Sequence, residues 1–193
     1  MSGRHSATGS PVRIHVVQGE QHVDNNPDAV LTTILGSCIA ACLWDPVSGY
    51  GGMNHFLLPG DESQVVDARN PGPSARYGVH AMELLVNALL RRGARRDSLR
   101  AKLFGGARMI RGLTDVGNLN AGFAEKFLQA EGIPIQGGSL RGDYGRRIQF
   151  WPVSGRARQV FLQGESQSQP LFQDEYKTSV TKTAGQTGDI ELF

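Results

Sequence analysis

The sequence has few cysteines, little net charge and no long apolar run, and each shortage excludes a class of protein. Its only cysteines, Cys38 and Cys42, lie four positions apart in an apolar segment. In an extended strand their Cα atoms would be about 13 Å apart, whereas a disulfide needs less than about 7 Å. We therefore predict free thiols and a reducing compartment, which excludes a disulfide-stabilised secreted domain.

No run of about 18 apolar residues is present, so we expect no membrane-spanning helix. The net charge of +2 is too small to indicate binding to nucleic acid or to an anionic membrane. The first residues lack the apolar stretch of a secretory signal, so we expect a cytoplasmic protein. Because HExxH, CxxC, GxGxxG and GKS motifs are also missing, we expect neither a metal site nor a cofactor.

The composition, with 39% hydrophobic residues and 25 glycines, is typical of one globular domain with many tight turns. We expect this domain at residues 12–164, preceded by a disordered segment at 1–11 and followed by a flexible polar tail at 165–193. The tail ends in Ile-Glu-Leu-Phe (190–193), which is either an unimportant end or a peptide that adds to a sheet edge.

Hydrophobic periodicity predicts a mixture of strands and helices without a regular βαβ alternation, which favours the α+β class with mixed β-sheet layers, sandwich-like, flanked by helices. Residues 18–28 are polar and are interpreted as a loop. The expected helices are 75–92 and 120–129, and the expected strands are 13–17, 29–35, 38–44, 52–58, 101–104, 133–136, 139–140, 147–151 and 160–162.

Two of the expected strands place a thiol near an imidazole. A tight turn centred between Pro46 and Val47 would put Cys38 directly opposite His55, with Cβ atoms about 5 Å apart. A thiol beside an imidazole can form a thiolate–imidazolium pair, which is a nucleophile at neutral pH. The pair therefore predicts nucleophilic catalysis.

The neighbouring residues support this hypothesis. A Gly-Ser pair before Cys38 lets the backbone turn, so the N–H groups of Ser37 and Cys38 could stabilise an oxyanion. The base needs a third group to orient its ring, and Thr32 is the candidate. The alternative is that a cysteine in an apolar strand is only a small core residue, and we assign Cys42 to that role.

A basic cluster follows the first expected helix. It is either a solvated helix end, which suits the helix dipole, or a docking patch for an acidic partner. Its members are Arg91, Arg92, Arg95, Arg96 and Arg100.

Three segments, TTILGSCIAACLWDP, GGMNHFLLP and AKLFGGA, resemble the CheD family of chemoreceptor glutamine deamidases. The similarity covers about residues 12–162. It implies an α+β fold, a cysteine nucleophile at Cys38, the histidine at His55, and the family's threonine at Thr32, six positions before the cysteine, rather than at Thr33. The sequence departs from the family pattern at Leu119 and at residues 139–142, outside the catalytic segments.

The resemblance also implies a reaction and its partners. A receptor glutamine would be converted to glutamate through a cysteine thioester, and the partners would be chemotaxis receptors and a CheC-type phosphatase. The alternative from a different class is a non-catalytic module that binds receptors or the phosphatase. The sequence does not choose the receptor glutamines that are modified.

Overall fold

The computed structural model describes residues 11–58, 73–109 and 115–162. The segment before Pro11 and the tail at 165–193, with its final residues 190–193, lie outside the described residues. The elements are β1 (Val12–His15), β2 (Gln21–Asp24), β3 (Ala29–Leu35), β4 (Ile39–Trp44), β5 (Gly51–Phe56), α1 (Pro73–Arg91), a 3-10 turn η1 (Arg96–Ser98), β6 (Arg100–Gly105), α2 (Val116–Ala130), β7 (Ile135–Leu140), β8 (Gly145–Trp151) and β9 (Arg156–Leu162).

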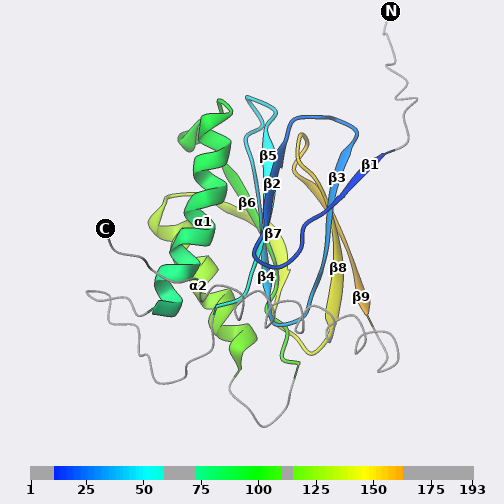
Figure 1. The fold of residues 1–193 in the computed structure, drawn as a ribbon, viewed down its shortest axis with the longest axis vertical. Coiled ribbons are helices and arrows are strands. Elements are labelled where there is room, and N and C mark those ends of the chain that lie inside the picture. The colour runs from blue at the N-terminus through cyan, green and yellow to red at the C-terminus, as the bar shows by residue number, and fades with distance from the viewer. Residues whose placement is uncertain (1–10, 59–72, 110–114, 163–193) are drawn as a thin grey trace, which may run out of the picture.

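These elements form three layers (Figure 1). A five-stranded sheet in the order β2-β5-β4-β6-β7 packs against a four-stranded sheet in the order β1-β3-β8-β9, and α1 and α2 cover the other face of the five-stranded sheet. The pairs β1–β3 and β6–β7 are parallel and the other pairs are antiparallel, which confirms the α+β class with mixed sheets. None of the described helices has the length and apolarity that crossing a membrane requires.

Strand β4 lies between two hydrophobic cores. Ile39, Ala41 and Leu43 pack under the helices, whereas Ala40 and Cys42 face the four-stranded sheet. All six residues of β4 are buried. A strand covered on both faces needs apolar side chains on both, which is why its sequence is a continuous apolar run rather than an alternation.

Strand β2 was missed by the sequence reading, which placed a loop at 18–28. The strand is polar and partly exposed because it pairs only with β5, at the edge of its sheet. Helix α2 begins earlier than the expected residue 120, since Asp115 caps its first turn by accepting a hydrogen bond from the Asn118 N–H at 3.0 Å. Gly117 fits there because a Cβ would lie 2.5 Å from the Gly106 carbonyl oxygen.

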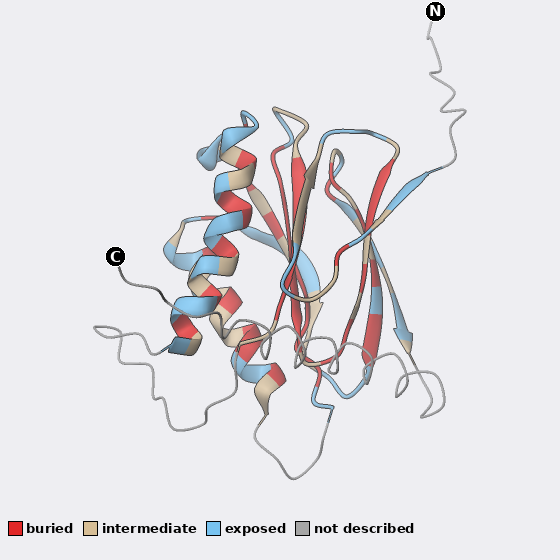
Figure 2. Cartoon of the chain, viewed as in Figure 1, coloured by how far each residue is buried: buried red, intermediate tan, exposed pale blue. Residues whose placement is uncertain are grey.

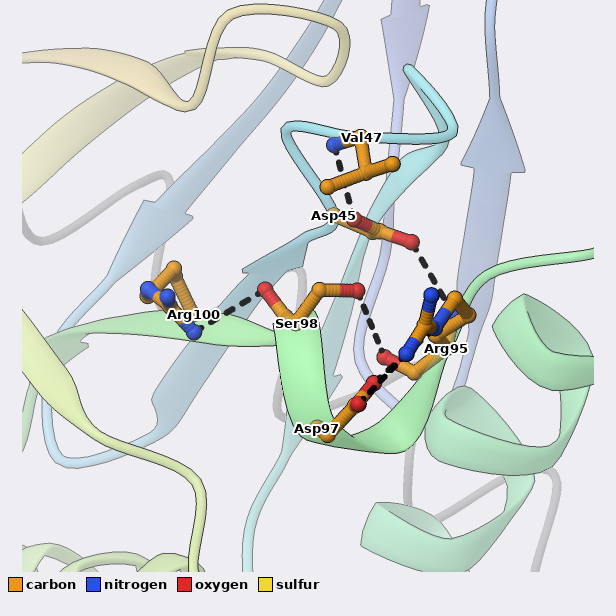
Figure 3. A network of polar contacts seen from close by, with 6 residues as sticks. All are labelled: Asp45, Val47, Arg95, Asp97, Ser98 and Arg100. Carbon is orange, nitrogen blue, oxygen red and sulfur yellow. Dashed lines mark hydrogen bonds and ion pairs between the residues drawn. The ribbon is translucent and has the colours of Figure 1, made fainter.

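The turn between β4 and β5 is fixed by the buried side chain of Asp45 (Figure 3). Its carboxylate accepts hydrogen bonds from the N–H groups of Val47 at 2.8 Å and Arg95 at 2.9 Å, so it joins the turn to the chain after α1. Burial alone would raise the pKa of Asp45, but these bonds and those from the Ser98 and Ser48 side chains outweigh it and lower the pKa to about 2. The hairpin that carries His55 is thereby anchored at its turn.

Candidate active site

Cys38 lies in a bend, residues 36–38, where the chain passes from β3 in one sheet to β4 in the other. Its side chain belongs to the core between the sheets, with Ala40 and Cys42, and is 7% exposed. Cys38 is therefore mostly enclosed by protein.

The backbone of this bend is held by three donors. The Gly36 carbonyl accepts from the Ala107 N–H at 2.8 Å. The Ser37 carbonyl accepts from the Asn120 side-chain amide at 2.9 Å, and the Cys38 carbonyl accepts from the Gly106 N–H at 2.8 Å. In a trans peptide the N–H points away from the preceding C=O. The N–H groups of Ser37 and Cys38 therefore point away from Ala107 and Asn120.

Asn120 connects the two segments that carry the candidate catalytic side chains. It is fully buried on α2. Its Nδ2 donates to the Ser37 carbonyl at 2.9 Å, and its Oδ1 accepts from the Leu58 N–H, just after β5, at 3.1 Å. Both the bend and the end of the histidine strand are thus tied to one helix.

His55 projects from β5 into the space between the sheets, but the expected register was wrong. The hairpin pairs His55 with Ala40 rather than with Cys38. The reason is that the connection is a longer loop, closed by a hydrogen bond from the Asp45 N–H to the Tyr50 carbonyl at 2.8 Å, and not a tight two-residue turn. A shift of two positions keeps the side chains on one face, and Cys38, in the bend just before β4, belongs to the core on that face.

The neighbours of the His55 ring determine which nitrogen carries its proton. The Thr33 hydroxyl donates to the Val16 carbonyl at 2.8 Å, so toward His55 Nδ1, at 2.9 Å, it can only accept. The Val16 carbonyl, 3.4 Å from Nδ1, is also an acceptor. Nδ1 therefore carries the proton and Nε2 bears the lone pair. Nε2 is buried and has no hydrogen-bond partner among the residues that the structure describes.

The threonine that contacts His55 is Thr33, whereas Thr32 was the expected one. Adjacent residues of a strand point to opposite faces. Thr33 is fully buried and reaches His55, whereas Thr32 is half-buried on the outer face and donates to the Ile148 carbonyl at 2.9 Å. Thr33, not Thr32, is therefore the threonine that can orient the ring.

Burial lowers the pKa of His55 to about 4, although the hydrogen bond to the Val16 carbonyl acts in the opposite direction. The ring is consequently neutral at neutral pH. This result does not support the expected thiolate–imidazolium pair in the resting protein. A neutral imidazole with its lone pair on Nε2 can instead accept the thiol proton during the reaction.

The side-chain amide of Gln18 contacts the Cys38 thiol, a contact that the sequence did not predict. Gln18 Oε1 accepts a hydrogen bond from Cys38 Sγ at 3.4 Å. The loop that carries Gln18 is bonded to the backbone of the histidine strand, since the Gly19 N–H donates to the His55 carbonyl at 2.7 Å and the His55 N–H donates to the Glu20 carbonyl at 3.0 Å. Gln18 stands in an ordinary polar stretch, and no sequence signal distinguishes it.

The second cysteine, Cys42, is enclosed in the core. Cys42 is fully buried, and burial raises the pKa of its thiol, which confirms its assignment to the core. Cys38 and Cys42 are not joined by a disulfide. Within the described ranges, His, Cys, Asp and Glu side chains do not gather in groups of three that could hold a metal ion.

Comparison with known proteins gives a consistent result. The family model for CheD, chemotactic sensory transduction, matches residues 57–160. A probable chemoreceptor glutamine deamidase CheD from Acidiphilium cryptum is 60% identical over 181 residues, which are 94% of this chain and 93% of that protein. A protein of the same name from Caulobacter vibrioides (strain NA1000 / CB15N) is 50% identical over 192 residues, covering 100% of this chain and 99% of the other.

Among solved structures, the chain is similar to the Neisseria meningitidis protein NMB0706 of family DUF152. The TM-score is 0.44 with 11% identity, over 68% of this chain and 64% of that chain. A likeness at this level carries no argument about activity.

Proposed function

Because this chain belongs to the CheD family, we propose that it hydrolyses glutamine side-chain amides of chemotaxis receptors and leaves glutamate. The names of its curated relatives support this function. The observation that carries the proposal is that the Cys38 thiol and the neutral His55 imidazole face the same core between the sheets, with the ring proton held on Nδ1 by Thr33. A cysteine nucleophile and its general base need this arrangement.

The first half of the reaction forms a thioester. His55 Nε2 takes the proton from Cys38 Sγ, and the sulfur attacks the carbonyl carbon of the substrate carboxamide. The C–N bond of the tetrahedral intermediate then breaks, and the imidazolium returns its proton to the leaving nitrogen, which departs as ammonia.

The second half hydrolyses the thioester. His55 Nε2 now takes a proton from water, and the resulting hydroxide attacks the thioester carbon. The C–S bond breaks and the sulfur recovers its proton from the imidazolium. The net reaction converts one glutamine and one water into one glutamate and one ammonia, with the enzyme unchanged.

The oxyanion of the tetrahedral intermediate needs hydrogen-bond donors, and we propose two groups of donors. The first is the pair of N–H groups of Ser37 and Cys38, which point away from the donors that hold the bend. The second is the side-chain amide of Gln18. Its NH2 group can reach the oxyanion if the amide flips as the Cys38 thiol loses its proton.

Replacing Gln18 with alanine should lower kcat by about 10² to 10³ with little change in KM, because an oxyanion donor acts mainly in the transition state. Gln18→Glu should lower kcat by at least as much, since a carboxylate accepts hydrogen bonds and repels a developing oxyanion. Steady-state ammonia release measures both variants. A Gln18→Glu variant as active as the wild type would refute this role.

Replacing Thr33 with valine should lower kcat by roughly 10- to 100-fold, since the near-isosteric change removes the acceptor that holds the proton on Nδ1. The matched control is Thr32→Val on the outer face of the same strand, for which we expect a kcat close to wild type. Thr33→Ser should restore most of the rate. If Thr32→Val lowered kcat and Thr33→Val did not, Thr32 would be the orienting residue.

The reaction class is tested by incubating a purified receptor cytoplasmic fragment with the protein. We expect stoichiometric ammonia release and, by mass spectrometry, the small mass gain of exchanging NH2 for OH at specific glutamines. A fragment that stays unchanged in mass while binding tightly would instead favour the non-catalytic module.

The partners and the location follow from the same proposal. Receptors would be the protein substrates, and the site would meet them from the cytoplasmic side, where a free thiol stays reduced. A CheC-type phosphatase remains a candidate partner on the basis of the family resemblance.

A further inference from the structure

The outer face of the four-stranded sheet carries a local excess of positive charge. Its strands, β1, β3, β8 and β9, contain neither aspartate nor glutamate. The helices lie on the far side of the molecule, and much of β1 and β9 is exposed (Figures 1 and 2). We call the outward-facing arginines and histidine of this sheet the basic face; they are Arg13, His15, Arg147, Arg156 and Arg158.

The basic face is concave. A hollow of about 490 Å³ lies on it and is lined by Arg13, His15, Arg147 and Arg158. Ile34 and Val160 add apolar surface to the same hollow. Its size is in the range of natural binding pockets, which is enough for a few side chains of a protein segment.

The arginines of the basic face form no ion pair within the part of the chain that the structure describes. Among the described residues, no carboxylate lies within 4.0 Å of Arg13, Arg147, Arg156 or Arg158. Arg156 stacks on Trp151, with its guanidinium carbon 4.2 Å from the ring centroid. Four like charges held together without counter-charges favour an anionic partner.

The basic cluster after α1 behaves differently. Arg95 pairs with Asp97 at 2.7 Å, and Arg96 pairs with Glu131. Arg100 donates to the Ser98 carbonyl at 3.1 Å (Figure 3). Much of this cluster is therefore occupied by contacts within the protein, which favours the solvated helix end over the docking patch.

We propose that the basic face is a docking surface for a carboxylate-rich segment of the protein substrate. Arginine suits carboxylates because its planar guanidinium binds them in a bidentate manner. This inference rests on the proposed function, since each deamidation adds a carboxylate to the substrate and makes it more acidic. The chain as a whole carries only +2, so the attraction is local and suits a short protein segment better than an extended lipid surface.

The position of the basic face relative to the site supports a substrate-binding role. Strand β3 separates the two: Ile34 lines the hollow on one face, while the adjacent Thr33 contacts His55 on the other. The mostly enclosed thiol at Cys38 offers little contact area of its own, whereas a stable protein–protein interface covers about 800 Å² on each partner. A second surface is therefore needed to hold a large substrate.

The test compares two double variants with the same charge change. Arg147→Glu with Arg158→Glu alters the basic face, and Arg91→Glu with Arg92→Glu alters the end of α1 as the control. On a receptor cytoplasmic fragment we expect KM to rise about tenfold or more for the first pair, with kcat within about twofold of wild type and a weaker dependence on salt. The control pair should keep the wild-type KM. Equal KM values for both pairs and the wild type would overturn the proposal.

A binding measurement separates this inference from the proposed function. The same charge changes are made in a Cys38→Ala background, and the affinity for the labelled fragment is measured by fluorescence anisotropy. Loss of binding only for the basic-face pair supports docking even if the wild type releases no ammonia, a result that would refute the proposed function alone. Unchanged fragment binding, together with loss of binding to vesicles containing phosphatidylglycerol, would overturn the inference in favour of a lipid surface.

Discussion

Replacing Cys38 with alanine should abolish ammonia release from a receptor fragment, with a loss of about 10³-fold or more in kcat, because the proposed thioester forms on the Cys38 sulfur. The substitution is small, and the bend is held by backbone and Asn120 contacts that do not involve the sulfur. The variant should therefore fold and still bind the fragment. Release at the wild-type rate would exclude the thioester mechanism.

Cys42 provides the matched control for this experiment. It lies on the same face of β4 but is fully buried. Its replacement by alanine removes one buried sulfur, which should cost about 1–2 kcal/mol of stability and leave most of the activity. A folded Cys42→Ala variant without activity would show that the nucleophile had been assigned to the wrong thiol.

Replacing His55 with glutamine should lower kcat by about 10² to 10⁴, the usual contribution of a general acid–base group. Glutamine can keep a hydrogen bond to Thr33 but has no nitrogen lone pair to accept the thiol proton. The control is His80→Gln, an exposed position on α1, for which we expect wild-type activity. If the two variants were equally active, the base would have to be another group.

The same histidine makes the stability of the protein depend on pH. Its pKa is lowered from 6.5 to about 4 in the folded chain, mainly by burial, so between these values the unfolded chain binds more protons. The resulting contribution, on the order of 3 kcal/mol, is present above about pH 6.5 and is lost as the pH falls toward 4. Denaturant unfolding of wild type and His55→Gln between pH 7 and 4 should show the wild type losing stability faster. Parallel curves would contradict a buried, neutral His55.

Local sequence was sufficient to predict most of the helices and strands. The apolar runs at 29–35 and 38–44 predicted two strands, and the second run is continuous because β4 is covered on both faces. Gly36 and Ser37 interrupt the apolar sequence, which predicted that Cys38 lies at the start of a strand. The polar edge strand β2 was missed, since its half-exposed position imposes no hydrophobic alternation that could be recognised.

The sequence by itself determined that a thiol and an imidazole would lie on one face of a hairpin, because strand alternation preserves that relation even when the register shifts by two. The tertiary structure decided their partners. Thr33 and Gln18 reach the site from a different sheet and from a loop, and Asn120 reaches it from a distant helix. Contacts between segments so far apart in the sequence depend on how the two sheets and the helices pack. The local pattern of apolar and polar residues does not predict that packing.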